Sequence, residues 1–339
     1  MRAIWKSACA LAVAALAAGT AIAAKPMTSA WDAQRRLDRG VNIIGYDPLW
    51  KDFRNGRFKT YHFYKIRQAG FSSVRIVLQA FDHMDAHNRL SQKWLDTLDW
   101  AVNGATHAGL NVIIDEHDFD KCSDNVAVCH DKLTAFWRQV GSHLRKQGDN
   151  VLFELLNEPH GALDADHWNS LLAELITIVR RDNPTRNLVI GPTQWNNFRQ
   201  LDTLELPEKD RHIIVTFHYY DPFPFTHQGA SWVEETKLLR GITWGTDADR
   251  AAVAKDFDEV AAWAKANDRQ ILLGEFGAYD GSGTPIEMRA AYTEAVAREA
   301  ERHGFSWAYW QFDSDFIAWD MKSNGWVEPI HKALIPEAR

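Results

Sequence analysis

The sequence predicts an α/β fold, a single-domain (β/α)8 TIM barrel, and three observations lead to this prediction. Short β-branched runs alternate with longer amphipathic segments, the runs number eight, and no linker, repeat or low-complexity stretch divides the chain. Strands that alternate with helices form parallel sheets, and eight parallel strands close such a barrel. A doubly wound open sheet is the second candidate, but no Gly-x-Gly-x-x-Gly turn follows the first expected strand.

Each expected strand is a run of four or five residues, most of them rich in Val, Ile and Leu. The runs cover residues 41–44, 73–77, 111–115, 151–154, 187–190, 213–217, 270–274 and 307–311. Helices are expected between them, including 92–107, 133–146, 165–181, 251–265 and 287–302, where apolar side chains recur three and four positions apart. Gly70, Gly109 and Gly304 come just after expected helices, where a left-handed cap favours glycine.

The first 23 residues have the pattern of a secretory signal peptide. Arg2 and Lys6 precede the apolar run 8–18, and Ala21-Ile22-Ala23 supplies the small residues that precede a cleavage site. We therefore expect cleavage after Ala23, a mature barrel domain at residues 24–339, and a secreted or periplasmic protein. The alternative is an N-terminal membrane anchor, for which the apolar run is short.

The charge of the mature domain excludes some classes of partner. Loss of Arg2 and Lys6 with the signal peptide takes the formal charge from −7 to −9. An acidic chain is a poor match for nucleic acid or an anionic membrane surface, so we expect neither as a partner. We expect the protein to be a monomer.

The mature domain has two cysteines, Cys122 and Cys129. In an oxidising compartment we expect them to form a disulfide, with two free thiols as the alternative. A metal site is disfavoured because Cys-x6-Cys is not a zinc-knuckle spacing, although His130 follows directly. We expect no metal and no cofactor.

Two segments place a glutamate where a buried strand meets a loop: Leu156-Asn157-Glu158-Pro159 and Leu273-Gly274-Glu275-Phe276-Gly277. In a parallel barrel the catalytic groups come from the carboxyl ends of the strands and the loops that follow. Cleavage of a glycosidic bond needs two such carboxylates, one as proton donor and one as nucleophile or base. Other polar and aromatic residues lie in or after the remaining strands: Asn42, Arg75, His117, Trp195, Asn196, His218, Tyr220 and Trp310.

These motifs resemble those of glycoside hydrolase family 5, historically cellulase family A. Residues 153–159 resemble its acid/base signature, and Gly274-Glu275-Phe276-Gly277 resembles its nucleophile segment. The resemblance extends along the mature chain, because each of the family's eight functional positions has a match: Arg75, His117, Asn157, Glu158, His218, Tyr220, Glu275 and Trp310. It implies that residues 24–339 form a glycoside hydrolase catalytic domain that retains anomeric configuration.

The resemblance also implies roles for these residues. Glu275 is expected to be the ionised nucleophile, with Arg75 and Tyr220 keeping its pKa low by charge-assisted hydrogen bonds. Glu158 is expected to be the acid/base, its pKa raised by the nearby carboxylate, and Asn157 to contact the substrate 2-hydroxyl.

Some of these residues have structural alternatives. Arg75 has the alternative role of an interior ion-pair partner, and His218 that of a core histidine. Glu154 is expected to make structural hydrogen bonds, and Glu116 to be a neighbour of the site.

Five tryptophans lie in or near the expected loops at the carboxyl end of the barrel: Trp50, Trp195, Trp232, Trp244 and Trp310. Flat indoles suit the apolar faces of sugar rings, and we expect about half of the five to contact substrate. We assign Trp195, Trp232 and Trp310 to the substrate site. The loop 221–232 resembles the Phe-Thr-His-Gln-Gly/Lys segment of some bacterial endoglucanases of the family.

We therefore expect a secreted, retaining, endo-acting β-1,4-glucanase whose partner is a polysaccharide or oligosaccharide. The alternatives within the family are a β-mannanase, a xyloglucanase and a β-1,3-glucanase. A non-catalytic glycan-binding barrel is disfavoured because both glutamates are present. A metal-dependent hydrolase is disfavoured because the chain has no His-x-His or His-Glu-x-x-His.

Overall fold

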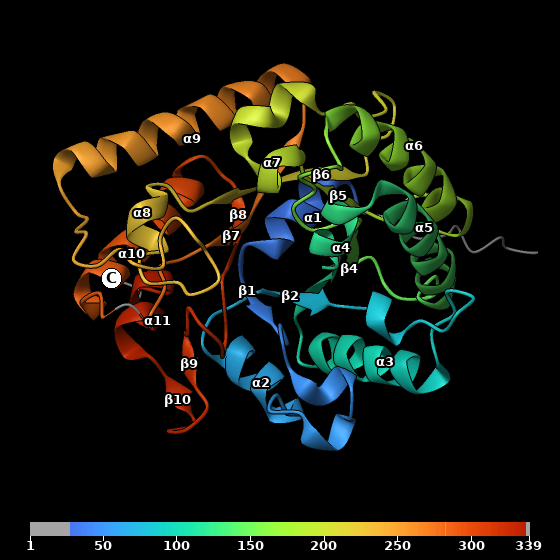
Figure 1. Cartoon of the computed structure of the whole chain (residues 1–339), viewed down its shortest axis with the longest axis horizontal. Coiled ribbons are helices and arrows are strands. Elements are labelled where there is room, and N and C mark those ends of the chain that lie inside the picture. The colour runs from blue at the N-terminus through green and yellow to red at the C-terminus, as the bar shows by residue number, and fades with distance from the viewer. Residues whose placement is uncertain (1–27, 282, 337–339) are drawn as a thin grey trace, which may run out of the picture.

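The computed structural model describes residues 28–281 and 283–336, and its central feature is a closed barrel of eight parallel strands (Figure 1). The strands pair in chain order, and Val41 of the first strand opposite Tyr309 of the last closes the barrel. Their bounds are β1 Arg39–Ile43, β2 Ser73–Leu78, β3 Asn111–Glu116, β4 Val151–Glu154, β5 Leu188–Ile190, β6 Ile213–Tyr219, β7 Gln270–Phe276 and β8 Ser306–Tyr309. The predicted (β/α)8 fold is confirmed, and every expected strand lies within two residues of an observed one at each end.

Helices surround this barrel (Figure 1). They are α1 Ala30–Leu37, α2 Thr60–Gln68, α3 Gln92–His107, α4 Phe119–Asp124, α5 Val126–His143, α6 Ala165–Asp182, α7 Thr193–Asn196, α8 Phe223–Thr226, α9 Asp247–Asn267, α10 Ile286–Arg302 and α11 Glu328–Leu334. A short hairpin, β9 Trp319–Asp320 and β10 Gly325–Trp326, precedes α11. All three glycines expected as helix caps have positive φ.

Two helices begin earlier than expected because polar caps extend them. The Asn125 side chain accepts a hydrogen bond from the backbone N–H of Val128, so α5 begins at Val126. Thr246 and Asp249 form a capping box, so α9 begins at Asp247. Both caps lie upstream of the apolar periodicity on which the expectation was based.

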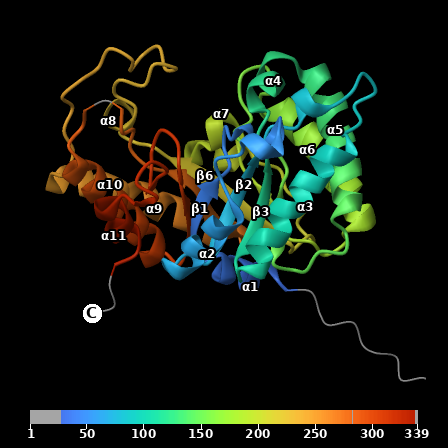
Figure 2. The same ribbon diagram turned by 90° about the horizontal axis from the view of Figure 1, so that it is seen from below.

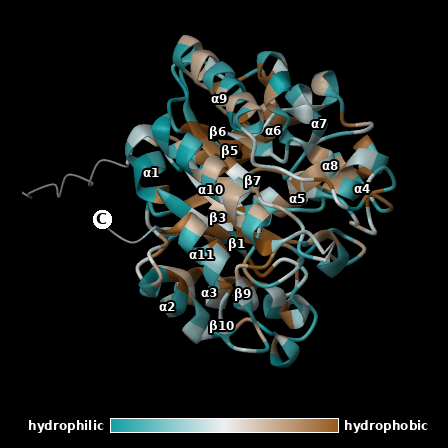
Figure 3. Ribbon diagram, turned by 90° about the vertical axis from the view of Figure 1, so that its left-hand side faces the viewer, coloured by the Kyte–Doolittle hydropathy of each residue, from teal (hydrophilic) through white to brown (hydrophobic). Residues whose placement is uncertain are grey.

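The barrel interior has an apolar end and a polar end. Helix α1, which was not predicted, packs Ala30, Ala33 and Leu37 against one inward side chain from each of five strands: Ile113, Leu152, Val189, Ile214 and Leu272. Figure 2 shows α1 at one end of the barrel and α4 and α8 at the other. Figure 3 shows brown, hydrophobic strands at the centre, surrounded by helices in which hydrophilic and hydrophobic residues alternate. The buried polar residues Asp115, Glu154 and Glu275, in contrast, lie at or next to the carboxyl ends of β3, β4 and β7.

The expected disulfide is present. Cys122 and Cys129 are joined by an S–S bond of 2.09 Å, which links α4 to α5. The expected signal peptide at residues 1–23 lies outside the described residues. Within the described part of the chain, no helix combines the length and the apolar character needed to cross a membrane.

The contacts of α1 predict that it stabilises the barrel. Leu37 is fully buried against the apolar layer, so Leu37→Ala should lower the free energy of unfolding by about 2–5 kcal/mol. Arg35, on the exposed face of the same helix, is the matched control, and Arg35→Ala should change it by less than about 0.5 kcal/mol. Denaturant unfolding measures both values, and an equal, small effect of the two substitutions would contradict a packing role for α1.

Candidate active site

The floor of the site is the Arg75 guanidinium, which is fully buried. It makes a two-point contact with Glu154, at 2.6 Å from Nε and 2.9 Å from Nη2. Its Nη2 lies 3.0 Å from Asp115, and its Nη1 donates to Glu275 Oε1 at 2.8 Å. Arg75 is therefore an ion-pair partner, the alternative raised by the sequence, and also a direct contact of the second candidate glutamate.

Two amides complete the ring of acceptors. Arg75 donates to Asn42 Oδ1 at 2.9 Å and to Asn157 Oδ1 at 2.7 Å. Asn157 Nδ2 lies 3.3 Å from His117 Nε2, and His117 Nδ1 lies 2.6 Å from Asp115. Burial lowers the pKa of His117 to about 4, so the ring is neutral at pH 7 and donates from Nδ1 to Asp115.

Glu275 reaches this ring because strand β7 carries an extra residue. Phe217 pairs with Leu273 and His218 pairs with Glu275, so Gly274 forms a β-bulge. A Cβ at Gly274 would lie 2.9 Å from His218 Nε2, closer than such contacts allow. Glycine at this position therefore lets Glu275 and the His218 ring lie side by side.

The environment of Glu275 differs from the expectation in one respect. The Tyr220 hydroxyl donates to Glu275 Oε2 at 3.0 Å, and with Arg75 it favours the ionised carboxylate, as expected. Burial nevertheless raises the pKa of Glu275, although the charges of His218 and Arg75 oppose this. The expectation of a low pKa was wrong because burial, together with the nearby charge of Glu158, outweighs the effect of Arg75.

Glu158 lies opposite, at a residue with left-handed backbone, φ 42°. Its Oε1 is 2.6 Å from His218 Nδ1, and His218 Nε2 accepts from Asn196 Nδ2 at 3.2 Å. Burial lowers the pKa of His218 to about 4, and the Asn196 contact assigns the proton of the neutral ring to Nδ1. His218 is therefore a hydrogen-bond donor to Glu158, and its alternative role as a core histidine is not supported.

Burial raises the pKa of Glu158 to about 7, although His117, Arg75 and His160 oppose the rise; the charge of Asp120 makes a smaller contribution that adds to it. The direction agrees with the expectation, but the main cause is removal from water rather than the neighbouring glutamate. One oxygen of Glu158, one oxygen of Glu275 and a ring nitrogen of His218 all lie within 4.8 Å of one another. The two carboxylates thus face each other across the space that a reacting atom would occupy.

The same three residues are the one group of potential metal ligands found among residues 28–281 and 283–336. Both ring nitrogens of His218 are already engaged, one with Glu158 and the other with Asn196. The 2.6 Å separation between His218 Nδ1 and Glu158 Oε1 is that of a direct hydrogen bond. The donor set is therefore arranged for hydrogen bonding rather than for holding a metal ion.

The tryptophans divide into surface and core. Trp195 and Trp232 expose 51% and 52% of their surface, so both are available to a ligand. Trp310 is nearly buried, but its ring stacks on His117 at 5.5 Å, beside the carboxylates. Trp50 and Trp244 lie in the segments after β1 and β6, as expected, but both are buried in the main core.

The sequence placed Asn196 after a strand but gave it no role, and it did not single out Tyr46. Asn196 follows two further left-handed residues, Gln194 and Trp195, and a Cβ at Gly191 would collide with its side chain. Tyr46 is half exposed, and partial burial together with the charges of nearby carboxylates, including Asp315, raises its pKa. No hydrophobic pattern marks such positions, although runs of turn residues after a strand would have been a usable signal.

The two further carboxylates differ in position. Glu154 makes the structural hydrogen bonds expected of it, to Arg75. Glu116 accepts a hydrogen bond from the backbone N–H of Asp118. It is thus adjacent to the site in sequence without contacting Glu158 or Glu275.

A family model for cellulase (glycosyl hydrolase family 5) matches residues 38–315. Endoglucanase H of Acetivibrio thermocellus is 30% identical over 313 residues, which are 88% of this chain and 33% of that protein. Endoglucanase B of Clostridium cellulovorans is 27% identical over 267 residues, which are 73% of this chain and 59% of that protein. The chain therefore spans between about a third and three fifths of the length of these two relatives.

Among solved structures, the endoglucanase Cel5A of Thermotoga maritima matches with a TM-score of 0.85 and 33% identity, over 91% of this chain and 100% of that one. Structures of that endoglucanase exist in complex with cellobiose and with mannotriose. The family model covers most of the barrel and the strand ends that carry both glutamates. The chain belongs to glycosyl hydrolase family 5.

Proposed function

We propose that this chain is a secreted, retaining, endo-acting glycoside hydrolase that cleaves β-1,4-glucan, with Glu158 as acid/base and Glu275 as nucleophile. The observation that carries the proposal is the approach of the two carboxylates to within 4.8 Å. Retaining glycosidases have carboxyl groups about 5–5.5 Å apart, whereas inverting ones leave room for a water molecule. The separation here supports double displacement through a covalent glycosyl-enzyme.

In the first step a Glu275 oxygen attacks the anomeric carbon, while Glu158 gives its proton to the departing glycosidic oxygen. Glu158 Oε1 accepts from His218, which leaves Oε2 to carry that proton. Bond formation removes the charge of Glu275, so the pKa of Glu158 falls. Glu158 then takes a proton from the water that attacks the glycosyl-enzyme.

Asn157 is assigned to the substrate 2-hydroxyl. Its Oδ1 accepts from Arg75, so Nδ2 is the free end of the amide, and one of its two N–H groups points to His117. The second N–H is available to the 2-hydroxyl of the sugar. A hydrogen bond there that strengthens in the transition state lowers the activation free energy of glycosidic bond cleavage.

Substrate choice rests on the aromatic residues and on the relatives. Trp310 offers a platform beside the carboxylates, and the exposed Trp195 and Trp232 extend the surface along the loops after β5 and β6. A solved structure described as a hyperthermophilic endo-β-1,4-glucanase, 33% identical to this chain, supports β-1,4-glucan as the substrate. Because the T. maritima endoglucanase was solved with mannotriose as well as cellobiose, β-mannanase activity is the first alternative, ahead of xyloglucanase and β-1,3-glucanase.

Export is part of the proposal. The Cys122–Cys129 disulfide supports an oxidising compartment, in agreement with a signal peptide at residues 1–23. We also propose that residues 24–339 act as a monomeric catalytic domain.

Product analysis tests the proposed function. Wild type, Glu158→Gln, Glu275→Gln and the exposed-site control Glu208→Gln are compared on carboxymethylcellulose, mannan, xyloglucan and β-1,3-glucan. The two site variants should lose activity by at least about a thousandfold, because each removes a reacting group, and azide should rescue only Glu158→Gln on substrates with good leaving groups. Preference for mannan would overturn the substrate, and full activity of Glu275→Gln would overturn the mechanism.

The pH profile tests the role of Glu158. The protonated form is the active one, so kcat/KM should fall as pH rises through about 7, approaching tenfold per unit. A glutamate at its ordinary pKa of 4.5 would give this alkaline limb more than two units lower. An alkaline limb near pH 5 would contradict the assignment of Glu158 as the buried proton donor.

A further inference from the structure

Helix α4 is tied to the loop that follows Glu158. The Cys122–Cys129 bond joins α4 to α5, and both cysteines are fully buried. The Ala162 N–H donates to the Ser123 carbonyl at 2.9 Å. A Cβ at Gly161 would lie 3.0 Å from the Ser123 Cβ, so the two segments are in close contact.

The same helix also packs against the site. The Phe119 ring lies 5.0 Å from His117 and 5.7 Å from His160. His160 in turn contacts the Glu158 carbonyl through Nδ1 at 2.8 Å. Helix α4 is therefore a wall of the site on the side of the proton donor.

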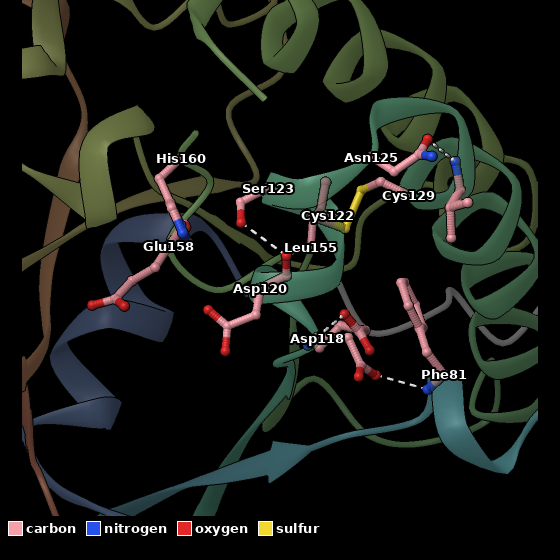
Figure 4. The surroundings of a disulfide bond; sticks show 12 residues. Phe81, Asp118, Asp120, Cys122, Ser123, Asn125, Cys129, Leu155, Glu158 and His160 are labelled. Atoms are coloured by element: carbon pink, nitrogen blue, oxygen red, sulfur yellow. Dashed lines mark hydrogen bonds between the residues drawn. A yellow bond between two sulfur atoms is a disulfide. The ribbon is translucent and has the colours of Figure 1, made fainter. Parts of the chain in front are cut away.

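Asp120 is the residue of this wall that faces the proton donor. Figure 4 shows the Asp120 and Glu158 side chains projecting into the same region, on the side of α4 away from the disulfide. Within the described chain no hydrogen bond or ion pair of the Asp120 carboxylate is found, whereas nearby Asp118 binds Lys121 and the Phe81 N–H. Its negative charge raises the pKa of both Glu158 and Tyr46, so Asp120 lies close enough to act on these two groups.

The position beside Glu158 indicates which sugar Asp120 meets. Glu158 protonates the glycosidic oxygen that departs with the leaving-group sugar, and Asp120 projects toward the same region as Glu158, so this sugar is the one that its carboxylate can reach. Sugar hydroxyls are donors, and an unpaired carboxylate is a strong acceptor for them.

We propose that Asp120 binds the leaving-group sugar by accepting hydrogen bonds from its hydroxyls, and that the Cys122–Cys129 disulfide holds α4 in the position that makes this contact. This inference rests on the proposed glycosidase function. It assigns the disulfide a role in substrate recognition as well as in stability.

Two substrates distinguish binding of the leaving-group sugar by Asp120 from a general effect of Asp120 on activity. Cellotetraose places sugars on the leaving-group side, whereas an aryl β-cellobioside places none there. In the full-length enzyme, Asp120→Ala should lower kcat/KM about tenfold more for cellotetraose than for the aryl substrate, because a hydrogen bond to a charged group is lost only with the former. Asp124→Asn, a charge change on an exposed residue of the same helix, should leave both values unchanged.

Two additional readouts make the result decisive. Asp120→Asn should move the alkaline limb of the pH profile to lower pH, because removing a neighbouring negative charge lowers the pKa of Glu158. The double variant Cys122→Ala, Cys129→Ala should show the same selective loss on cellotetraose while its melting curve remains cooperative.

The comparison of the two substrates can contradict either the role of Asp120 or the proposed function. Equal losses on both substrates, or no loss on either, would overturn it while leaving the proposed function intact. A wild-type enzyme inactive on both substrates would overturn the proposed function, and this inference with it.

Discussion

The buried guanidinium of Arg75 is the interaction on which the site depends. A cation removed from water is costly unless charged and polar partners surround it, and Arg75 has three carboxylates and two amides as acceptors. These partners come from β1, β3, β4, the loop after β4, and β7. A change of register in any of these strands would remove one hydrogen-bond acceptor from the buried Arg75 guanidinium. The contacts that hold Glu275 therefore also favour the observed pairing of the strands in the barrel.

This arrangement explains why the barrel has two ends of opposite character. At the end near α1 the interior is filled by aliphatic side chains, which supply packing. At the other end the interior is filled by Arg75 and its partners, and the backbone adopts left-handed conformations at Glu158, Trp195 and Asn196. Such conformations cost free energy and are found where surrounding structure holds a functional group in place. The free energy gained by aliphatic packing near α1 thus offsets the cost of the left-handed backbone at the end that carries the glutamates.

The sequence predicted much of the fold and the main site residues. The eight strands were visible because each is a short apolar run, and the two glutamates because each ends such a run. The family resemblance identified Arg75, His117, His218 and Tyr220, whose side chains the structure brings together around the carboxylates.

Other features were not predictable from pattern alone. The bulge at Gly274 depends on pairing with β6, and helix α1 depends on the apolar layer that only the closed barrel creates. Trp50 and Trp244 are adjacent to loops in sequence yet buried, because a tryptophan in a loop segment has no periodicity that reports its direction. The pKa of Glu275 could not be inferred from its contact with Arg75, since the sequence did not show how completely the barrel buries this carboxyl group.

The central claim is that Glu275, held by Arg75, attacks the sugar. Treatment with a 2-deoxy-2-fluoro-cellobioside carrying a good leaving group, followed by peptide mass spectrometry, tests this most directly, because the fluorine slows hydrolysis of a glycosyl-enzyme. The account predicts one covalent sugar on the peptide containing Glu275, and none in Glu275→Gln. A label on Glu158 or Glu154, or hydrolysis of the substrate by Glu275→Gln at the wild-type rate, would contradict it.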